Sequence, residues 1–383
     1  SLKHITEINV EGRTATVGAG VILSNMNDAA EANDLIFPLT LGARGSAMIG
    51  GLLSTNAGGS NVVRYGSTRG LCLGLEVVMA DGRIMNLMSA LHKDNSGLDL
   101  RNLIIGAEGT LGIITAAVLR LLPKPKAYAS AMVAVPQLSD ALSLLHRLQD
   151  ATGHGVEAFE YMPRSYIDKH MELFPDASAP FDAEHDVNIM IEVAATQDKD
   201  ALPGDDGQLP VVATLEGLLG EMLERGSLLD AVIAQNEAQR QEMWKRREDA
   251  GEVAFFGGAF VNTDVALPLD QIAEFETRLT PRIKAIDPDS EEVIVAHLGD
   301  GNIHHTTYIK RNDPVIKDAL VEAVEDVVQE LGGSFSAEHG IGVSKLETMR
   351  RRKDPVALDA MRAIKAALDP KGILNPGKVI PAP

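Results

Sequence analysis

Residues 293–304, Val-Ile-Val-Ala-His-Leu-Gly-Asp-Gly-Asn-Ile-His, predict a β-hairpin. The first four are apolar as in a buried strand, the glycine-rich residues 299–302 suit a turn, and residues 303–309 suit the return strand. A four-residue loop would place His297 opposite His304, and directly opposed residues carry Cβ atoms roughly 4.5–5.5 Å apart on one face. Two imidazoles at that spacing can bind the same metal ion.

The segment after the hairpin supplies a third candidate ligand. Asp313-Pro314 followed by apolar residues at helical spacing predicts a helix that Gly332-Gly333 ends. The run 334–337, which we expect to be short and buried, then leads to Glu338 and His339. Two imidazoles and a carboxylate with an open position form the ligand set of catalytic rather than structural zinc. The plain alternative is a polar strand end followed by an unrelated glycine turn.

Length and composition narrow the class of protein. A chain of 383 residues with 45% hydrophobic and 4% aromatic residues suits a globular protein of two domains. The formal charge of −19 argues against binding to nucleic acid or to anionic membrane surfaces. The single cysteine, Cys72, lies in an apolar run, which favours a buried packing role over a disulfide or a thiolate metal site. No apolar run reaches the roughly 18 residues of a transmembrane helix.

The most unusual composition lies in residues 42–66, where seven of 25 residues are glycine. We expect no regular helix or strand there. Glycine lets backbone N–H groups approach a ligand and point toward it, which suits a phosphate or the edge of a heteroaromatic ring. A glycine-rich surface loop is the alternative, but the apolar pairs 48–49 and 52–53 require burial. A second glycine run spans residues 106–112.

The remaining pattern predicts two domains. Alternating apolar residues predict hairpins at 5–20 and 71–87, and Pro123-Lys-Pro125 marks a boundary. Beyond it, strands and helices follow each other as in an α+β domain. Residues 243–248 gather three cations. Their plain interpretation is a solvated helix face with Trp244 as its anchor, and the functional one is a guanidinium fork for a carboxylate.

Together these motifs resemble those of a known family. The chain contains five of them in the order found in FAD-linked D-2-hydroxyacid dehydrogenases, which include D-lactate and D-2-hydroxyglutarate dehydrogenases. They are Gly-Gly-Leu-Leu-Ser-Thr-Asn-Ala-Gly-Gly (50–59), Ala-Glu-Gly-Thr-Leu-Gly-Ile-Ile-Thr (107–115), His-Leu-Gly-Asp-Gly-Asn-Ile-His (297–304), Ala-Glu-His-Gly-Ile-Gly (337–342) and Leu-Asn-Pro-Gly-Lys (374–378). The resemblance covers essentially the whole chain.

The resemblance implies an α+β, two-domain fold of the vanillyl-alcohol oxidase type. Residues 1–123 would form the FAD-binding domain. Residues 124–345 would form a substrate or cap domain with the metal site, and residues 346–383 would return to the FAD domain.

The resemblance also implies roles for individual residues. His297, His304 and Glu338 match metal ligands for Zn²⁺ or another divalent transition metal. His339 matches a general base, and Arg247 matches an arginine for the substrate carboxylate. The residues implied to contact FAD are Gly42, Ser46, Gly50, Gly51, Thr55, Asn56, Ala57, Gly58, Gly59, Tyr65, Gly66, Glu108, Gly109, Gly112, Ile114 and Asn375.

The implied reaction is the oxidation of a D-2-hydroxy acid to the 2-oxo acid. His339 would remove the hydroxyl proton, and hydride would pass from Cα to the flavin N5. We expect an acceptor such as an electron-transfer flavoprotein or a quinone rather than oxygen. A homodimer is compatible with the family, and we expect a location in the bacterial cytoplasm or an organelle matrix.

Two departures from the family pattern affect these expectations. In the D-2-hydroxyglutarate branch, a threonine, a lysine and an asparagine stand where this chain has Gly251, Asn262 and Thr306, which puts a second substrate carboxylate in doubt. The family's pyrophosphate-binding glycine loop would precede residue 1, and we expect weak FAD binding if the molecule lacks it. The alternatives are a non-redox FAD-dependent transferase of the same fold and a non-catalytic, truncated subunit.

Overall fold

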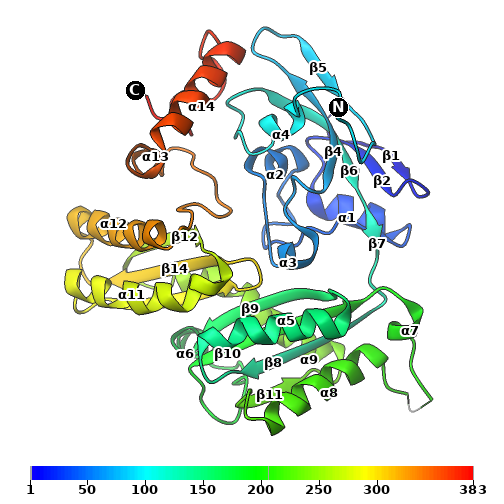
Figure 1. Cartoon of the computed structure of the whole chain (residues 1–383), viewed down its shortest axis with the longest axis vertical. Coiled ribbons are helices and arrows are strands. Elements are labelled where there is room, and N and C mark those ends of the chain that lie inside the picture. The colour runs from blue at the N-terminus through cyan, green and yellow to red at the C-terminus, as the bar shows by residue number, and fades with distance from the viewer. Residues whose placement is uncertain (1, 206, 383) are drawn as a thin grey trace. The chain divides into compact units, whose positions relative to one another are not determined.

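The computed structural model describes residues 2–205 and 207–382, which form two compact units (Figure 1). Unit 1 contains the chain up to Lys124 together with the segment from Glu338 onward, and unit 2 contains Pro125–Ala337. The first boundary lies one residue from the expected position. The second follows Ala337 rather than residue 345, so the candidate ligand Glu338 opens the segment that rejoins unit 1.

Unit 1 is built on an antiparallel five-stranded sheet in the order β1-β2-β6-β4-β5, beside a small β3-β7 pair. Both predicted hairpins are confirmed, because β1 pairs with β2 and β4 pairs with β5. Gly82, at a φ of 84°, supplies the left-handed residue in the second turn. The strands are β1 (Ile5–Asn9), β2 (Thr14–Gly18), β3 (Leu35–Ile36), β4 (Cys72–Val78), β5 (Ile84–Leu87), β6 (Ile113–Arg120) and β7 (Leu122–Pro123).

The helices of unit 1 correct one prediction. They are α1 (Leu23–Glu31), α2 (Ile49–Thr55), α3 (Val62–Tyr65), α4 (Leu100–Ile104), α13 (Leu346–Arg352) and α14 (Pro355–Leu368). The prediction that residues 42–66 contain no regular helix is wrong, since α2 and α3 lie there. Helical spacing buries Ile49, Leu52 and Leu53, and this burial outweighs the roughly 1 kcal/mol that each helical glycine costs. Asn56, in the left-handed conformation, ends α2.

The core of unit 1 joins the sheet to its helices. Leu23 and Met26 of α1 are fully buried in it, as is Cys72, which has the expected packing role. Burial raises the pKa of the Cys72 thiol to about 12. Ile364 and Leu368 of α14 pack against the same core, so the C-terminal segment is an integral part of unit 1.

Unit 2 is built on an antiparallel seven-stranded sheet in the order β11-β8-β10-β9-β13-β14-β12. The hairpin predicted at 293–309 is confirmed as β13 and β14. The central strand β9, which pairs with both β10 and β13, was not predicted from the sequence. The strands are β8 (Ala127–Ala134), β9 (Val156–Pro163), β10 (Val187–Ala195), β11 (Asp230–Ile233), β12 (Ala259–Ala266), β13 (Glu291–His297) and β14 (Asn302–Ile309).

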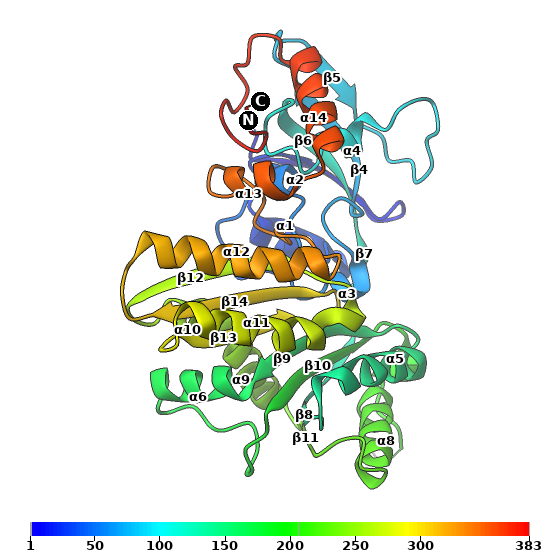
Figure 2. The ribbon, with the colours of Figure 1, turned by 60° about the vertical axis from the view of Figure 1, so that its left-hand side comes forward.

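Helices pack on both faces of this sheet. One face contacts α6 (Arg164–Leu173), α9 (Glu237–Glu248) and α10 (Ala250–Ala254), and the other contacts α5 (Ala141–Thr152), α8 (Pro210–Glu224), α11 (Ile272–Ile286) and α12 (Pro314–Glu330). Figure 2 shows α11 and α12 running along the β12–β14 edge. Short turns η1 (Leu138–Asp140) and η2 (Leu269–Gln271) and helix α7 (Asp198–Ala201) complete the unit. Because side chains alternate along a strand, neighbouring residues of one strand serve opposite faces.

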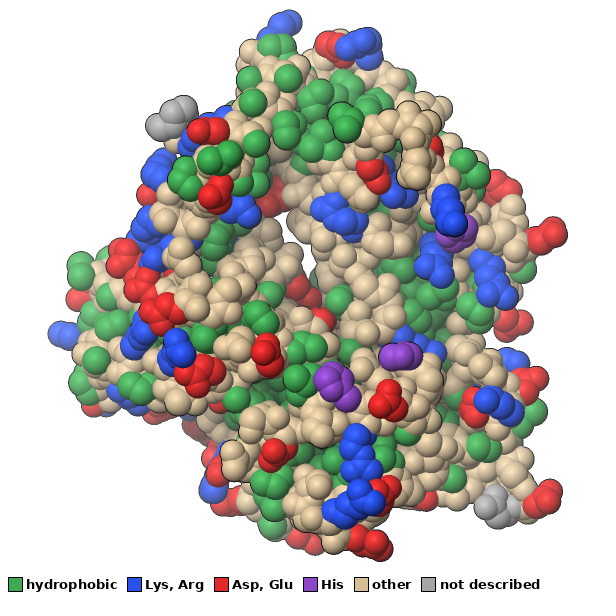
Figure 3. Space-filling view, in the orientation of Figure 1, with side chains coloured by type: hydrophobic (Ala, Val, Ile, Leu, Met, Phe, Trp, Pro, Cys, Tyr) green, Lys and Arg blue, Asp and Glu red, His purple; other side chains and the backbone are tan. Residues whose placement is uncertain are grey.

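The structure also shows how charged side chains are distributed on one face and whether a helix could span a membrane. Acidic and basic side chains are interspersed on the face drawn in Figure 3. Among the residues that the structure describes, no helix combines the length and the apolar character needed to cross a bilayer.

Candidate active site

His297 and His304 come from the predicted hairpin, but its register differs from the expected one. His297 pairs with Asn302, and His304 pairs with Val295, so the prediction that the two histidines are directly opposed is wrong. The reason is a loop that closes earlier, where the Gly301 N–H donates to the His297 carbonyl. The shift is two residues, which preserves the face of every side chain. The two imidazoles therefore still meet, edge to face, with ring centroids 5.4 Å apart.

Glu160 of β9 and Arg247 of α9 lie beside His297. Glu160 Oε1 is 2.9 Å from His297 Nδ1, and the Arg247 Nε–H donates to Glu160 Oε2 at 2.6 Å. Arg247 Nη2 also lies 3.2 Å from His297 Nε2. Arg246 and Arg247 are only 4% and 7% exposed, so the plain interpretation of residues 243–248 as a solvated helix face is wrong for both arginines.

A second buried carboxylate holds α9 on the sheet. Glu192 of β10 accepts hydrogen bonds from Arg240 Nε at 2.6 Å and from Trp244 Nε1 at 2.8 Å. Ser130 of β8 donates to the same carboxylate at 2.7 Å. Trp244 is an anchor, as expected, but it acts through a hydrogen bond as well as through packing. Charge pairing with two strand glutamates, rather than an apolar stripe, thus explains how such a basic helix is buried.

Glu160 is ionised despite its complete burial. Burial by itself would raise the pKa of this carboxyl, but the neighbouring His297 and Arg247, through charge and hydrogen bonds, hold the pKa below its ordinary value. A carboxylate can only accept hydrogen bonds, so His297 Nδ1 carries a proton and donates a hydrogen bond to Glu160.

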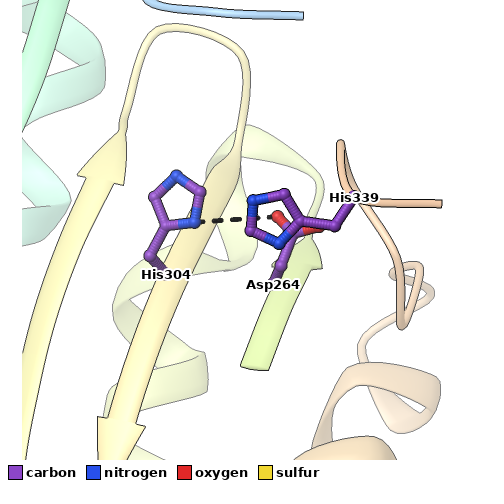
Figure 4. A group of neighbouring side chains, drawn as sticks. All are labelled: Asp264, His304 and His339. Carbon is purple, nitrogen blue, oxygen red and sulfur yellow. Dashed lines mark ion pairs between the residues drawn. The ribbon is translucent and has the colours of Figure 1, made fainter. Parts of the chain in front are cut away.

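His304 has its own carboxylate neighbour. Asp264 of β12 pairs with His304 of β14 in the strand register, and Asp264 Oδ1 lies 3.7 Å from His304 Nδ1 (Figure 4). The Asn302 side chain donates to Asp264 Oδ1 at 2.8 Å and fixes the carboxylate, which is buried. Histidines that bind a metal commonly have a carboxylate behind the other ring nitrogen, which orients the ring. The donor set of His297 and His304 therefore fits a metal ion.

Glu338 and His339 directly follow the last residue of unit 2. The Ala337 N–H donates to the Asp264 carbonyl at 3.3 Å. Consecutive Cα atoms are about 3.8 Å apart, so the covalent chain keeps Glu338 close to the β12 residue that pairs with His304. Within unit 1, a Cβ at Gly58 would lie 3.0 Å from Glu338 Oε1, so glycine at this position leaves room for the carboxylate.

The run 334–337 before these residues is not buried as expected. Ser334 is exposed and forms an isolated bridge with Ala266, and the other three residues are half-buried. The run lies beside β12, the edge strand of the sheet, so one of its sides has no strand to cover it. Gly333 allows the close approach, since a Cβ there would lie 2.4 Å from the Ala266 carbonyl oxygen.

Glu108 links three segments of unit 1. Its carboxylate accepts the backbone N–H groups of Ile341 at 2.8 Å and Gly342 at 2.9 Å. Its carbonyl accepts Asn375 Nδ2 at 2.6 Å. A Cβ at Gly340 would lie 2.7 Å from Glu108 Oε1, so this loop requires glycine. Glu108 and Asn375, implied by the family to contact FAD, thus also fix the loop that follows His339.

Replacing Glu108 by Gln is expected to loosen residues 340–342. One oxygen becomes an N–H₂ donor facing a backbone N–H, so a hydrogen bond to a charged acceptor, worth about 1.5–3 kcal/mol, is lost. Amide hydrogen exchange should then accelerate at Ile341 and Gly342. Asn375→Ala is the control, because it removes only the bond to the Glu108 carbonyl. Equal exchange in wild type and Glu108→Gln would contradict the clamp.

The glycines expected at the cofactor fall into two groups. For Gly50, Gly59 and Gly112 the chain itself requires glycine; a Cβ at Gly59, for example, would lie 1.9 Å from the Thr40 carbonyl oxygen. At Gly42, Gly51, Gly66 and Gly109 a Cβ would meet nothing within 4 Å. Gly66 and Gly109 have positive φ, which favours glycine. At Gly42 and Gly51, neither a steric contact nor a positive φ explains the missing side chain. A ligand that closely approaches the backbone would explain it, so these residues fit a bound cofactor.

The other expected cofactor residues have local partners. Ser46 and Thr55 donate to the backbone carbonyls of residues 43 and 51. Asn56 Oδ1 accepts from Ser67 Oγ and from the residue 69 N–H, and the Ala57 carbonyl accepts from the residue 68 hydroxyl. The Tyr65 ring lies 5.1 Å from the Arg64 guanidinium carbon, and Ile114 is part of the core. These contacts position the segment within unit 1.

The residues aligned with the distal-carboxylate positions lie on the strands of the histidine site. Asn262 of β12 pairs with Thr306 of β14, and Asn262 Nδ2 donates to Thr306 Oγ1 at 2.7 Å. Asn262 is two residues from Asp264 on β12, and Thr306 is two residues from His304 on β14. Side chains alternate along a strand, so both residues lie on the same sheet face as the histidines. Gly251 lies in α10, and a Cβ there would meet nothing within 4 Å. None of these three residues carries a charge.

Comparison with known proteins identifies two family models. The model described as "FAD linked oxidases, C-terminal domain" matches residues 124–379, and "FAD binding domain" matches residues 1–88. Among solved structures, an alkyldihydroxyacetonephosphate synthase matches with a TM-score of 0.68 over 98% of this chain and 65% of that chain. At 15% identity, this likeness shows the fold alone.

Curated relatives share one type of name. The chain is 37% identical to "D-2-hydroxyglutarate dehydrogenase, mitochondrial" of Rattus norvegicus, over 95% of this chain and 65% of that protein. It is 33% identical to "D-2-hydroxyglutarate dehydrogenase" of Stutzerimonas stutzeri, over 100% of this chain and 80% of that protein. It is 30% identical to a "D-2-hydroxyglutarate--pyruvate transhydrogenase" of Saccharomyces cerevisiae, over 99% of this chain and 76% of that protein. The chain thus spans 65% of the rat protein's length.

Proposed function

The chain belongs to the family of FAD-linked oxidases, and from this premise we propose that it oxidises a D-2-hydroxy acid to the 2-oxo acid. The names of the relatives support the substrate class. The observation that carries the proposal is the group of Glu160, His297, Arg247 and His304 on one sheet face. It combines nitrogen donors for a cation with a guanidinium for a carboxylate, and a 2-hydroxy acid offers a hydroxyl and a carboxylate to match.

FAD is the proposed cofactor of unit 1. Gly42 and Gly51, whose missing side chains no contact within the chain explains, support close approach of a ligand to the backbone. When bound, FAD supplies the acceptor for the hydride that leaves the substrate Cα. The chain's contribution is to hold and orient the ring system through the segments 42–66 and 106–112.

The proposed metal ligands are His297, His304 and Glu338. The ion is Zn²⁺ in the first instance, although nitrogen and oxygen donors also accept Mn²⁺, Fe²⁺ or Co²⁺. It supplies Lewis acidity that makes a coordinated hydroxyl more acidic. The carboxylates beside His297 Nδ1 and His304 Nδ1 support this assignment, because a carboxylate behind one ring nitrogen commonly orients a metal-binding imidazole.

His339 and Arg247 are the proposed catalytic residues. His339 takes the proton from the substrate hydroxyl, which requires a neutral imidazole at the working pH. Arg247 binds the substrate carboxylate through Nη1, the edge of the guanidinium that Glu160 and His297 leave available. Two anchors at adjacent substrate atoms fix which face of Cα meets the cofactor, and this accounts for selectivity toward one enantiomer.

The proposed electron acceptor is an electron-transfer flavoprotein or a quinone, and the chain is proposed to act as a homodimer.

The test is an anaerobic reaction of the purified, flavin-loaded chain with matched D- and L-2-hydroxy acids. The visible flavin absorbance should bleach with the D series and persist with the L series, and elemental analysis should find one metal ion per chain. Bleaching by neither series would contradict the proposed reaction. A flavin-free chain that binds metal would point to a non-catalytic subunit.

Selectivity for a second substrate carboxylate is expected to depend on residue 262. Asn262→Lys should lower KM for a D-2-hydroxy diacid at least about tenfold relative to a monoacid, since a hydrogen bond to a charged group contributes about 1.5–3 kcal/mol. Asn262→Met, of similar size and without charge, is the control. The prediction fails if steady-state kinetics give both variants the same ratio of KM values.

A further inference from the structure

Glu160 is a buried carboxylate shared by two functional candidates from different elements. It lies on β9, between His297 of β13 and Arg247 of α9, and it is 0% exposed. Its Oε1 faces His297 Nδ1 at 2.9 Å, and its Oε2 accepts from Arg247 Nε at 2.6 Å. Both oxygens therefore have a partner, and each partner belongs to the proposed site.

A buried ion pair of this kind needs a reason beyond stability. Removing charges from water costs several kcal/mol per ion, and apolar residues of similar volume often stabilise a fold equally well. The neighbouring core on this sheet face is apolar, with Met162, Met190 and Val295. An apolar residue at position 160 would pack there but would leave Arg247 and His297 unoriented.

We propose that Glu160 is a positioning residue that fixes the metal ligand His297 and the substrate-binding Arg247 at once; this inference rests on the proposed function. Glu160 accepts a hydrogen bond from His297 Nδ1–H. In the neutral imidazole this contact selects the tautomer in which Nε2 carries the lone pair, and it fixes the plane of the ring. By holding Nε of Arg247, it leaves the outer edge of the guanidinium for a carboxylate. Metal affinity and carboxylate affinity therefore depend on the same side chain.

Glu192 offers a matched control. It is a buried glutamate of the adjacent strand β10, and its neighbour Met190 pairs with Glu160 in the register. It holds the same helix, α9, through Arg240 and Trp244, but its hydrogen bonds go to these two residues and Ser130 rather than to His297. A loss caused only by a loosened α9 should appear in both glutamine variants, whereas a loss of ring orientation should appear only at position 160.

The experiment measures Zn²⁺ affinity of the full chain by competition with a chromogenic chelator. Glu160→Gln should bind Zn²⁺ about 10–100-fold more weakly than wild type, whereas Glu192→Gln should stay within about threefold. In steady-state kinetics with a 2-hydroxy acid, Glu160→Gln should also raise KM. Glu160→Asp keeps the charge but is one methylene shorter, so it should lower Zn²⁺ affinity as well, because positioning needs the length.

Specific outcomes overturn the inference. Equal losses of Zn²⁺ affinity in Glu160→Gln and Glu192→Gln would show that Glu160 only anchors α9. If Glu160→Gln does not fold by circular dichroism, Glu160→Asp decides, and wild-type Zn²⁺ affinity in that variant refutes the positioning role. A wild-type chain that oxidises D-2-hydroxy acids without binding metal would overturn this inference while leaving the proposed reaction standing. A wild-type chain that binds Zn²⁺ without oxidising these acids would instead overturn the proposed reaction.

Discussion

His304→Ala is expected to abolish stoichiometric metal binding and to slow oxidation of a D-2-hydroxy acid by roughly three orders of magnitude. Loss of an orienting partner alone commonly weakens metal affinity about 10–100-fold, and loss of a ligand should exceed that. A metal ion that makes a hydroxyl more acidic supplies several kcal/mol to the reaction, and each 1.36 kcal/mol corresponds to about a factor of ten in rate. Elemental analysis and stopped-flow flavin reduction measure the two effects.

The adjacent histidine provides the control for this prediction. His305 lies on the opposite face of the sheet, where its Nε2 contacts Glu292 at 3.0 Å and its ring meets Phe275 edge to face. His305→Gln removes an imidazole one residue away, and it should keep full metal content. Metal loss in both variants would mean that the hairpin as a whole, rather than the His304 ligand, is responsible. Full metal content in His304→Ala would contradict the proposed metal site.

The sequence predicted the elements that follow simple periodicities. The hairpin at 293–309, the helix capped by Asp313 and the boundary near Pro123–Pro125 all appear in the structure. The predicted pairing partner of His297 is wrong, because the loop determines the register and begins one residue earlier than predicted. The conclusion drawn from that pairing survived, since an even shift leaves both histidines on one face.

The sequence could not reveal the partners of the histidines. Glu160 stands in a strand between apolar residues, where a lone glutamate normally indicates a solvated position. Its role depends on Arg247, 87 residues away in sequence, for which charge alone favours a solvated helix face. The contact between them is not evident when each residue is considered without the other. Hydrophobic periodicity is evaluated within one segment at a time, so it does not detect a buried ion pair whose two residues lie in different segments.

Behind the histidine face, the same strands carry a second buried polar cluster. Tyr161 follows Glu160 on β9 and points to the opposite face, where its hydroxyl donates to Glu276 Oε2 of α11 at 3.4 Å. Glu292 and His305, also on that face, pair with each other. Burial, followed by the nearby charge of Glu292, raises the pKa of Glu276 to about 7, although its bond with Tyr161 opposes the shift.

This raised pKa sets the sign of a pH effect on stability. Between the ordinary pKa of 4.5 and about 7, the unfolded chain ionises at Glu276 while the folded chain keeps its proton. Rising pH therefore favours unfolding across this range, and the loss is complete above about pH 7. A shift of this size corresponds to about 3 kcal/mol at 1.36 kcal/mol per pKa unit.

Glu276→Gln should therefore stabilise unit 2 above pH 7 and leave it nearly unchanged near pH 4.5. The neutral amide has a similar shape and does not ionise, so the Tm difference from wild type should grow with pH to roughly 6–12 °C, at about 2–4 °C per kcal/mol. Glu274→Gln, on the same helix but partly exposed, deletes a charge outside the buried cluster and serves as the control. Thermal unfolding at several pH values measures the trend. A Tm difference that is independent of pH would mean that Glu276 is already ionised in the folded protein, and that the buried cluster tolerates its charge.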